Sequence, residues 1–157
     1  MNQQDIEAVI EVLAQHGLAD IDPTEDQLRA LLAGDMEGPY HFVNLLRFRD
    51  TAAYPTDHEL AIEQLTGAEA YDRYGAVALA QVTRRGGRLM TLNNVERPLI
   101  GSGGPWHRVA TMEYQNVNAF IDMLMDPEYQ ASLVHRNAGL EATEVLVTRP
   151  LIIDPVG

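Results

Sequence analysis

Cysteine is missing from this chain of 157 residues, and its absence removes several kinds of chemistry. Without thiols the chain has no disulfides, no thiolate ligands for a metal and no cysteine nucleophile. Positive charge is also scarce, because Lys and Arg total 11 against 23 Asp and Glu, which gives a formal charge of −12. A surface this negative repels phosphate backbones and anionic lipid headgroups, so we expect neither a nucleic acid nor a membrane as a partner.

Long apolar runs are absent as well. No run approaches the roughly 20 residues that a membrane-crossing helix needs. Residues 1–16 are acidic and amphipathic, and they lack the basic and apolar stretches of a signal peptide. We therefore expect a cytoplasmic protein. The hydrophobic content of 46% is enough for a core, and the length is that of one ordinary domain.

The first part of the chain, residues 1–36, predicts two helices. Apolar residues recur at intervals of three and four over residues 6–13, which is the pattern of one buried helix face. Thr24 and Gln27 have the spacing of a capping box and predict the start of the second helix. We interpret this part as a helical extension that precedes a domain at residues 37–157.

The rest of the chain alternates between short apolar runs and amphipathic segments. Short runs rich in β-branched and aromatic residues predict strands, whereas helical periodicity with caps predicts helices. The predicted strands are 40–49, 88–97, 106–114 and 141–153, and the predicted helices are 66–86, 117–125 and 126–137. Asp126-Pro127 restarts the helix that begins at residue 117, so the last two helical segments count as one element. The order is then β-α-β-β-α-β, the split βαβ arrangement. It predicts an α+β, ferredoxin-like domain with a four-stranded antiparallel sheet and its helices on one face.

The predicted strands are apolar on both faces. Leu45 and Leu46 put apolar side chains on opposite faces of the first strand, and Leu146 and Val147 do so in the last. Soluble monomers rarely expose a contiguous apolar patch of that size. A second sheet covering it would make a homodimer, a dimeric α+β barrel, and a usual interface buries about 800 Å² per partner. Alternatively, residues 1–36 or the last strand cover this face within one chain.

Several short motifs along the chain, in this order, resemble those of one known family. They are His41-Phe42-Val43-Asn44-Leu45-Leu46-Arg47-Phe48-Arg49, Gly67-Ala68-Glu69-Ala70-Tyr71-Asp72-Arg73-Tyr74, Arg85-Gly86-Gly87-Arg88, and Asp126-Pro127-Glu128-Tyr129-Gln130 with His135-Arg136. Over roughly residues 38–150 the chain resembles the domain of unknown function 1330 family. The resemblance implies a place in the dimeric α+β barrel superfamily, which includes cofactor-free monooxygenases, isomerases, haem enzymes and proteins of no known activity. The two-helix extension departs from the short form of the family, and no particular reaction is implied.

Metal, nucleotide and serine-nucleophile sites find little support in the sequence. The histidines show no pairing at i,i+2 or i,i+4, so we expect no metal and no cofactor. The loop containing Gly101, Gly103 and Gly104 leads through Pro105 into a strand, whereas a phosphate cradle leads into a helix. These glycines therefore predict turn conformations. No serine lies in a nucleophile-elbow pattern.

A polar and aromatic set remains near the space between sheet and helices, or inside the barrel. Arg can hold a carboxylate by two hydrogen bonds, and His titrates near neutral pH. Polar side chains in apolar strands need partners or a pocket. Each also has a structural interpretation, such as a core tyrosine with its hydroxyl at the surface. The candidate substrate-binding residues are Asn44, Arg47, Tyr71, Tyr74, Trp106, Arg108 and Arg136, and the candidate catalytic residues are His135 and His107.

Three functions stay open at this point, and the residues name neither a substrate nor a reaction. The first is a cofactor-free enzyme, monooxygenase- or isomerase-like, in which His135 or His107 moves a proton on a small aromatic or carboxylated molecule. The second is a non-catalytic binding or sensing module that uses the same pocket. The third is a structural dimer whose helical extension recruits a protein partner through an exposed apolar stripe on residues 6–13.

Overall fold

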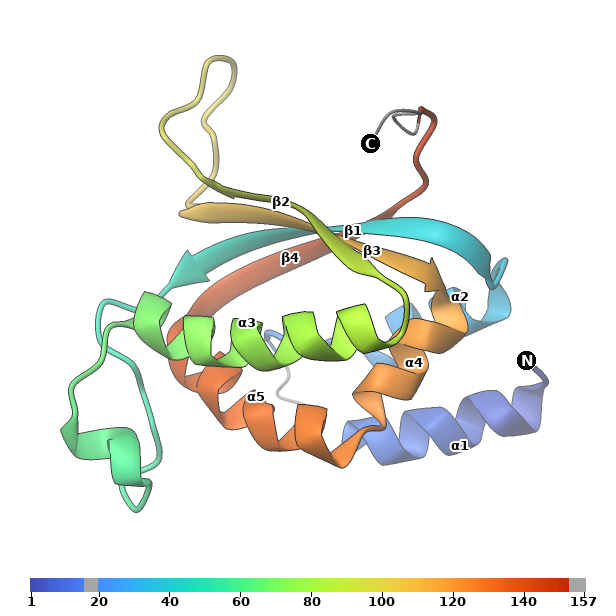
Figure 1. Cartoon of the computed structure of the whole chain (residues 1–157), viewed down its shortest axis with the longest axis horizontal. Coiled ribbons are helices and arrows are strands. Elements are labelled where there is room, and N and C mark those ends of the chain that lie inside the picture. The colour runs from blue at the N-terminus through green and yellow to red at the C-terminus, as the bar shows by residue number, and fades with distance from the viewer. Residues whose placement is uncertain (16–19, 153–157) are drawn as a thin grey trace.

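The computed structural model describes residues 1–15 and 20–152, which form one antiparallel sheet with helices on one face (Figure 1). The sheet order is β2-β3-β1-β4, and every neighbouring pair is antiparallel. This is the predicted ferredoxin-like α+β fold. Its elements are α1 (Gln3–Ala14), α2 (Glu25–Ala33), β1 (Glu37–Phe48), the short 3-10 helix η1 (Glu59–Ile62), α3 (Gly67–Arg84), β2 (Arg88–Asn94), β3 (Arg108–Asn116), α4 (Val117–Leu124), α5 (Pro127–Gly139) and β4 (Leu140–Thr148).

Side-chain caps fix where the helices begin. The Thr66 hydroxyl accepts a hydrogen bond from the backbone of Glu69, and the Glu69 carboxylate accepts one from the backbone of Thr66. The same capping box forms between Thr24 and Gln27 at the start of α2, as the spacing predicts. At the far end of α3, Gly86 has a φ of +80°, a left-handed conformation that ends the helix before β2.

The hairpin loop between β2 and β3 is longer than predicted. β2 ends at Asn94 and β3 begins at Arg108, so the prediction that Trp106 lies in a strand is wrong. Gly101 and Gly103 have φ values of +78° and +77°, the turn conformations expected of them. Strand pairing does not continue through such conformations, so the ladder between β2 and β3 ends at the pair Asn94 and Arg108.

Two other strand ends differ from their predicted positions. β1 begins at Glu37, three residues earlier than expected. β4 ends at Thr148, because Pro150 has no backbone N–H for a ladder hydrogen bond. The predicted end of that strand, Ile153, lies outside the described residues.

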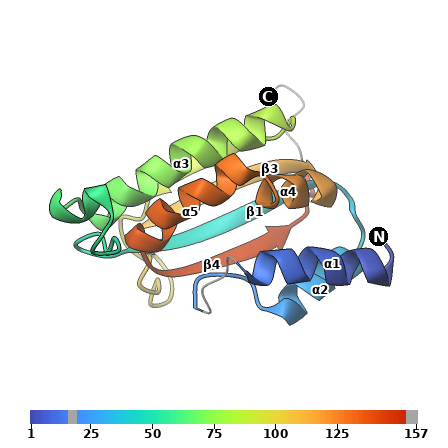
Figure 2. The ribbon, with the colours of Figure 1, turned by 90° about the horizontal axis from the view of Figure 1, so that it is seen from below.

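The helical extension packs against α4, on the helix side of the sheet (Figures 1 and 2). The apolar stripe of residues 6–13 is therefore buried against its own domain. This removes the support for a protein partner that docks on the stripe. It also removes the alternative in which the extension covers the second face of the sheet. The buried cluster consists of Ile6, Ile10, Leu28, Leu32, Val117 and Ile121.

The other face of the sheet, here called the open face, has none of the described helices over it (Figure 1). Alternation along β1 places Val43 and Leu45 on this face, and Leu146 of β4, which pairs with Val43, is 50% exposed there. Glu113 interrupts the apolar surface, because it pairs with His41 and Arg88 on the same face. The open face is thus only partly apolar. The β2–β3 loop and the segment after β4 rise on this side.

Candidate functional site

A row of aromatic rings joins β1 to helices α3 and α5. The centroids of His107 and Phe48 are 6.0 Å apart, and those of Phe48 and Tyr71 are 5.4 Å apart. The row continues from Tyr71 to Tyr74 at 5.2 Å and from Tyr74 to Tyr129 at 5.8 Å. The hydroxyls of Tyr74 and Tyr129 share a hydrogen bond of 2.8 Å. Burial raises the pKa of Tyr71 and Tyr129, so these hydroxyls stay protonated.

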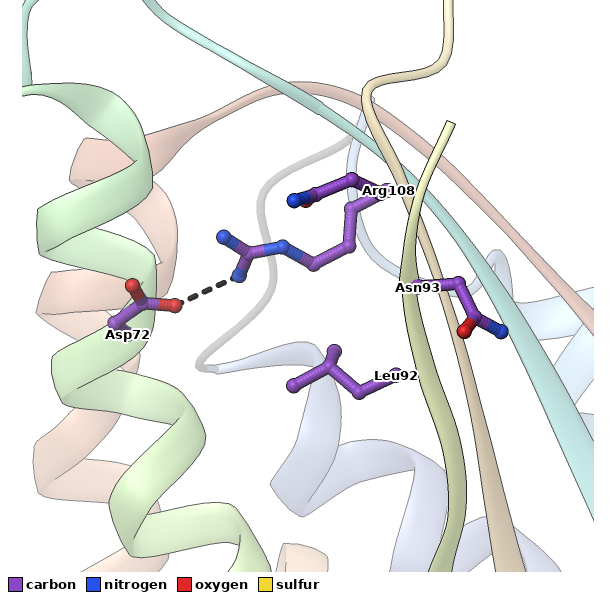
Figure 3. Close-up of a pocket in the computed structure, with 5 residues that line it drawn as sticks. Asp72, Leu92, Asn93 and Arg108 are labelled. Atoms are coloured by element: carbon purple, nitrogen blue, oxygen red, sulfur yellow. Dashed lines mark hydrogen bonds and ion pairs between the residues drawn. The ribbon is translucent and has the colours of Figure 1, made fainter. Parts of the chain in front are cut away.

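Arg108 lies at the Phe48 end of the aromatic row. Its guanidinium carbon is 4.7 Å from the centroid of the Phe48 ring, and its side chain is only 16% exposed. Nη1 donates a 2.7 Å hydrogen bond to the Asp72 carboxylate on α3 (Figure 3). Nε and Nη2 have no hydrogen-bond partner among the residues that the structure describes. A pocket of about 390 Å³ opens beside them, with Leu92 and Asn94 in its wall.

Arg136, on α5, lies close to Tyr71, Tyr74 and Tyr129 of the aromatic row. Its Nη1 lies 2.8 Å from the Asp22 carboxylate, and its Nη2 donates to the carbonyl of Ile21. The side chains of Arg136 and Asp22 are 12% and 18% exposed. Burial alone would lower the pKa of Arg136, but the neighbouring Tyr74, Tyr129 and Asp22 raise it overall. The site therefore holds a buried positive charge whose hydrogen bonds go to the helical extension.

His135 belongs to a separate cluster around the connection between β1 and α3. Its Nδ1 lies 2.7 Å from the Tyr54 hydroxyl, and the His58 ring stacks on Tyr54 with centroids 4.8 Å apart. Burial, followed by the charges of His58 and Arg73, lowers the pKa of His135. Its imidazole is therefore neutral at pH 7, with Nε2 free of hydrogen bonds within the described part of the chain.

A second groove, of about 480 Å³, lies along α5 and contains none of the predicted site residues. Leu133 and Val134 supply an apolar wall, together with Pro55. Arg49 and Asn137 supply polar groups. No sequence pattern predicts this groove, because its walls come from segments that are about 80 residues apart and carry no shared motif.

Asn44 and Arg47, the polar interruptions of β1, are both satisfied within the domain. The Asn44 amide donates 3.1 Å hydrogen bonds to the backbone carbonyls of Phe42 and Ala110. Arg47 lies on the open face, and its Nε donates a 2.6 Å hydrogen bond to the Glu141 carboxylate. Their local partners favour the structural interpretation for both residues.

The structure thus divides the predicted residues between several places. Phe48, Tyr129, Asp72 and Asp22 also belong to the two arginine sites, and none of them is among the candidate residues predicted from the sequence. Tyr129 could have been found, since it lies in the quoted Asp126–Gln130 motif. Asp22 could not, because it is 114 residues from Arg136 along the chain. The aromatic row and its two arginines contain Tyr71, Tyr74, His107, Arg108 and Arg136, whereas Asn44, Arg47, Trp106 and His135 lie elsewhere.

Ionisable groups elsewhere in the domain form pairs. Burial alone would raise the pKa of Glu113, but hydrogen bonds from His41 and Arg88 lower it overall. No three His, Asp or Glu side chains within residues 1–15 and 20–152 come together so that they could hold a metal ion. None of the helices in the same residues is both long and apolar enough to cross a bilayer.

Comparisons with known proteins give a family but no activity. Residues 60–150 match the family described as "Domain of unknown function (DUF1330)". The crystal structure of methylated RPA0582 protein shares 37% identity and a TM-score of 0.75, over 85% of this chain and 96% of that chain. A crystal structure of RPA0582, a protein of unknown function from Rhodopseudomonas palustris, shares 36% identity and a TM-score of 0.75, over 87% and 100% of the two chains. No curated protein matches the chain.

Proposed function

Since this chain belongs to the domain of unknown function 1330 family, whose description assigns no reaction, we propose a function from the chain's own geometry. We propose that it is a homodimer that binds a small carboxylated, preferably aromatic, molecule at Arg108. The observation that carries the proposal is the unpaired Nε and Nη2 edge of a guanidinium that is only 16% exposed and faces a pocket of about 390 Å³.

The unpaired edge of Arg108 suits a carboxylate. A guanidinium presents pairs of N–H groups that match the two oxygens of a carboxylate. The contact with Asp72 does not prevent this, because two other arginines of the chain each bind two carboxylates at once. Arg29 pairs with two glutamates and Arg85 with two aspartates. Leu92, which lines the pocket, offers apolar surface for the rest of the ligand.

Binding without catalysis fits this pocket better than an enzyme does. Neither candidate catalytic histidine lines the pocket at Arg108. His107 is near, but its Nδ1 already accepts a hydrogen bond from the backbone of Phe48. A general acid or base must reach the proton that it transfers, so neither histidine is placed for that step in this pocket.

Calorimetric titration with benzoate and with its neutral analogue benzamide tests the proposed site. Benzoate should bind the native protein at least tenfold more tightly than benzamide, and Arg108→Gln should remove that preference. Arg97→Gln is the matched control, because Arg97 is exposed in the β2–β3 loop and has no ion-pair partner in the part of the chain described. Equal benzoate affinity in the native protein and in Arg108→Gln would refute the site.

The homodimer is supported by apolar side chains on the side of the sheet that lacks helices. Leu99 and Ile100 in the β2–β3 loop are 97% and 91% exposed, and Leu151 and Ile152 after β4 are 98% and 88% exposed. Both segments rise on the same side as the open face (Figure 1). Covering a Leu or Ile side chain yields about 1.5–3 kcal/mol, so a second copy on this side gains from each of them.

A cofactor-free enzyme is the second candidate, and the cluster at His135 favours it. A neutral imidazole with a free Nε2, oriented by a hydrogen bond between Nδ1 and Tyr54, is equipped to accept a proton. The double variant His107→Gln, His135→Gln separates the two functions. A binding module should keep its benzoate affinity within about twofold, whereas a loss beyond tenfold, about 1.4 kcal/mol, would return a histidine to the ligand site.

A further inference from the structure

The segment Ile21-Asp22, between α1 and α2, places one apolar and one acidic side chain against the domain. The Ile21 side chain packs with Tyr71 against a buried cluster that includes Leu46 and Leu140. The next residue, Asp22, extends its carboxylate to the Arg136 guanidinium at 2.8 Å. An aliphatic group is thus held in an apolar cluster while a carboxylate beside it neutralises a buried cation.

The domain itself leaves Arg136 without a partner. Both hydrogen bonds that Arg136 makes among the described residues go to the helical extension, one to Asp22 and one to the carbonyl of Ile21. An unpaired charge at 12% exposure is costly, so this position requires an anion in any state of the protein. The tyrosines around it present hydroxyls and no competing carboxylate.

We propose that Arg136 is a second binding position, specific for a small aliphatic carboxylic acid, and that Ile21 and Asp22 occupy it as an intramolecular substitute. The apolar group of the acid would take the place of the Ile21 side chain, and its carboxylate the place of Asp22. This site is independent of the pocket at Arg108 and of the homodimer, so either proposal can fail alone.

The two helices of the extension need not leave when the segment between them moves. α1 and α2 are held on α4 by their own buried cluster, which includes Ile10 and Leu32 and does not include Ile21. A tethered group competes at an effective concentration in the millimolar range. A free acid therefore meets strong competition in the native chain and weak competition once the Asp22 carboxylate is removed.

Titration with 4-methylpentanoate, which joins an isobutyl group to a carboxylate, tests the proposal. Asp22→Ala should bind this acid at least tenfold more tightly than the native protein, and adding Arg136→Gln should abolish the gain. Asp20→Asn is the matched control, because Asp20 is exposed and makes no hydrogen bond or ion pair with Arg136 in the part of the chain that the structure describes. This variant should behave as the native protein. Arg108→Gln in the Asp22→Ala background should leave the gain intact.

An Asp22→Ala protein that folds and binds no more tightly than the native protein overturns the proposal, and so does a gain that survives Arg136→Gln. Amide NMR spectra of the native protein give a second measurement that needs no variant. Saturating 4-methylpentanoate should shift the amide resonances of Ile21 and Asp22 and leave those of α1 and α2 in place. Unchanged resonances of these two residues in the presence of bound acid would also overturn the proposal.

Discussion

Leu146→Asp should break the proposed homodimer, and the size of the effect can be worked from the structure. Leu146 is 50% exposed on the open face, opposite Val43 of β1. Since burying a whole Leu side chain is worth about 1.5–3 kcal/mol, covering the exposed half gives about 1 kcal/mol per copy and about 2 kcal/mol per dimer. That loss weakens dimerisation about 30-fold, because 1.4 kcal/mol corresponds to a factor of ten. An aspartate buried against Val43 adds a desolvation cost, so 30-fold is a lower limit.

Sedimentation equilibrium over a range of protein concentrations measures this dissociation constant. Ile62→Asp provides the matched control, because Ile62 is 86% exposed in η1, on the helix side of the sheet, and should not alter association (Figure 1). Circular dichroism should show that both variants keep their secondary structure. If Leu146→Asp associates as tightly as Ile62→Asp, the open face is not the dimer interface.

Three further predictions concern stability, each measured by urea unfolding. Leu46→Ala removes a side chain that is 1% exposed and should lower the free energy of unfolding by about 2–5 kcal/mol, whereas Ile62→Ala, at 86% exposure, should change it little. Thr66→Ala removes the cap of α3 and should cost about 1 kcal/mol, with the exposed Thr56→Ala as control. For His135 the folded pKa is lowered, so the unfolded chain binds more protons at pH values below about 6.5. Stability should therefore fall as the pH drops from 7 toward 5.5, and His135→Gln should flatten that fall; an equal fall in both proteins would contradict the lowered pKa.

The fold was accessible from the sequence because its signals are local. The capping box at Thr66 and Glu69 marks the start of α3 within four residues, and the order of strands and helices follows from periodicity. The strand boundaries were predicted less well, because the hydrogen-bonded pairing with neighbouring strands decides where a strand begins and ends. Trp106 looks like the start of a strand by composition, yet the strand begins at Arg108, where register with β1 and β2 begins.

The candidate site could be predicted from the sequence only in part, because some of its contacts are local and others join distant segments. Tyr71 and Tyr74 follow helical spacing, so their common face could be predicted from the sequence. The pairing of Arg136 with Asp22 spans 114 residues and depends on where the extension docks, which no local pattern specifies. His135 and Arg136, which are neighbours in sequence, were predicted to belong to one candidate site. Adjacent positions on a helix point about 100° apart, which takes His135 to Tyr54 instead.

Light scattering of the unmodified protein at high concentration is the most direct test of the proposed architecture. A homodimer predicts a particle of about 35 kDa, twice the chain mass of 17.4 kDa. A single, well-behaved 17.4 kDa particle at every concentration would contradict it.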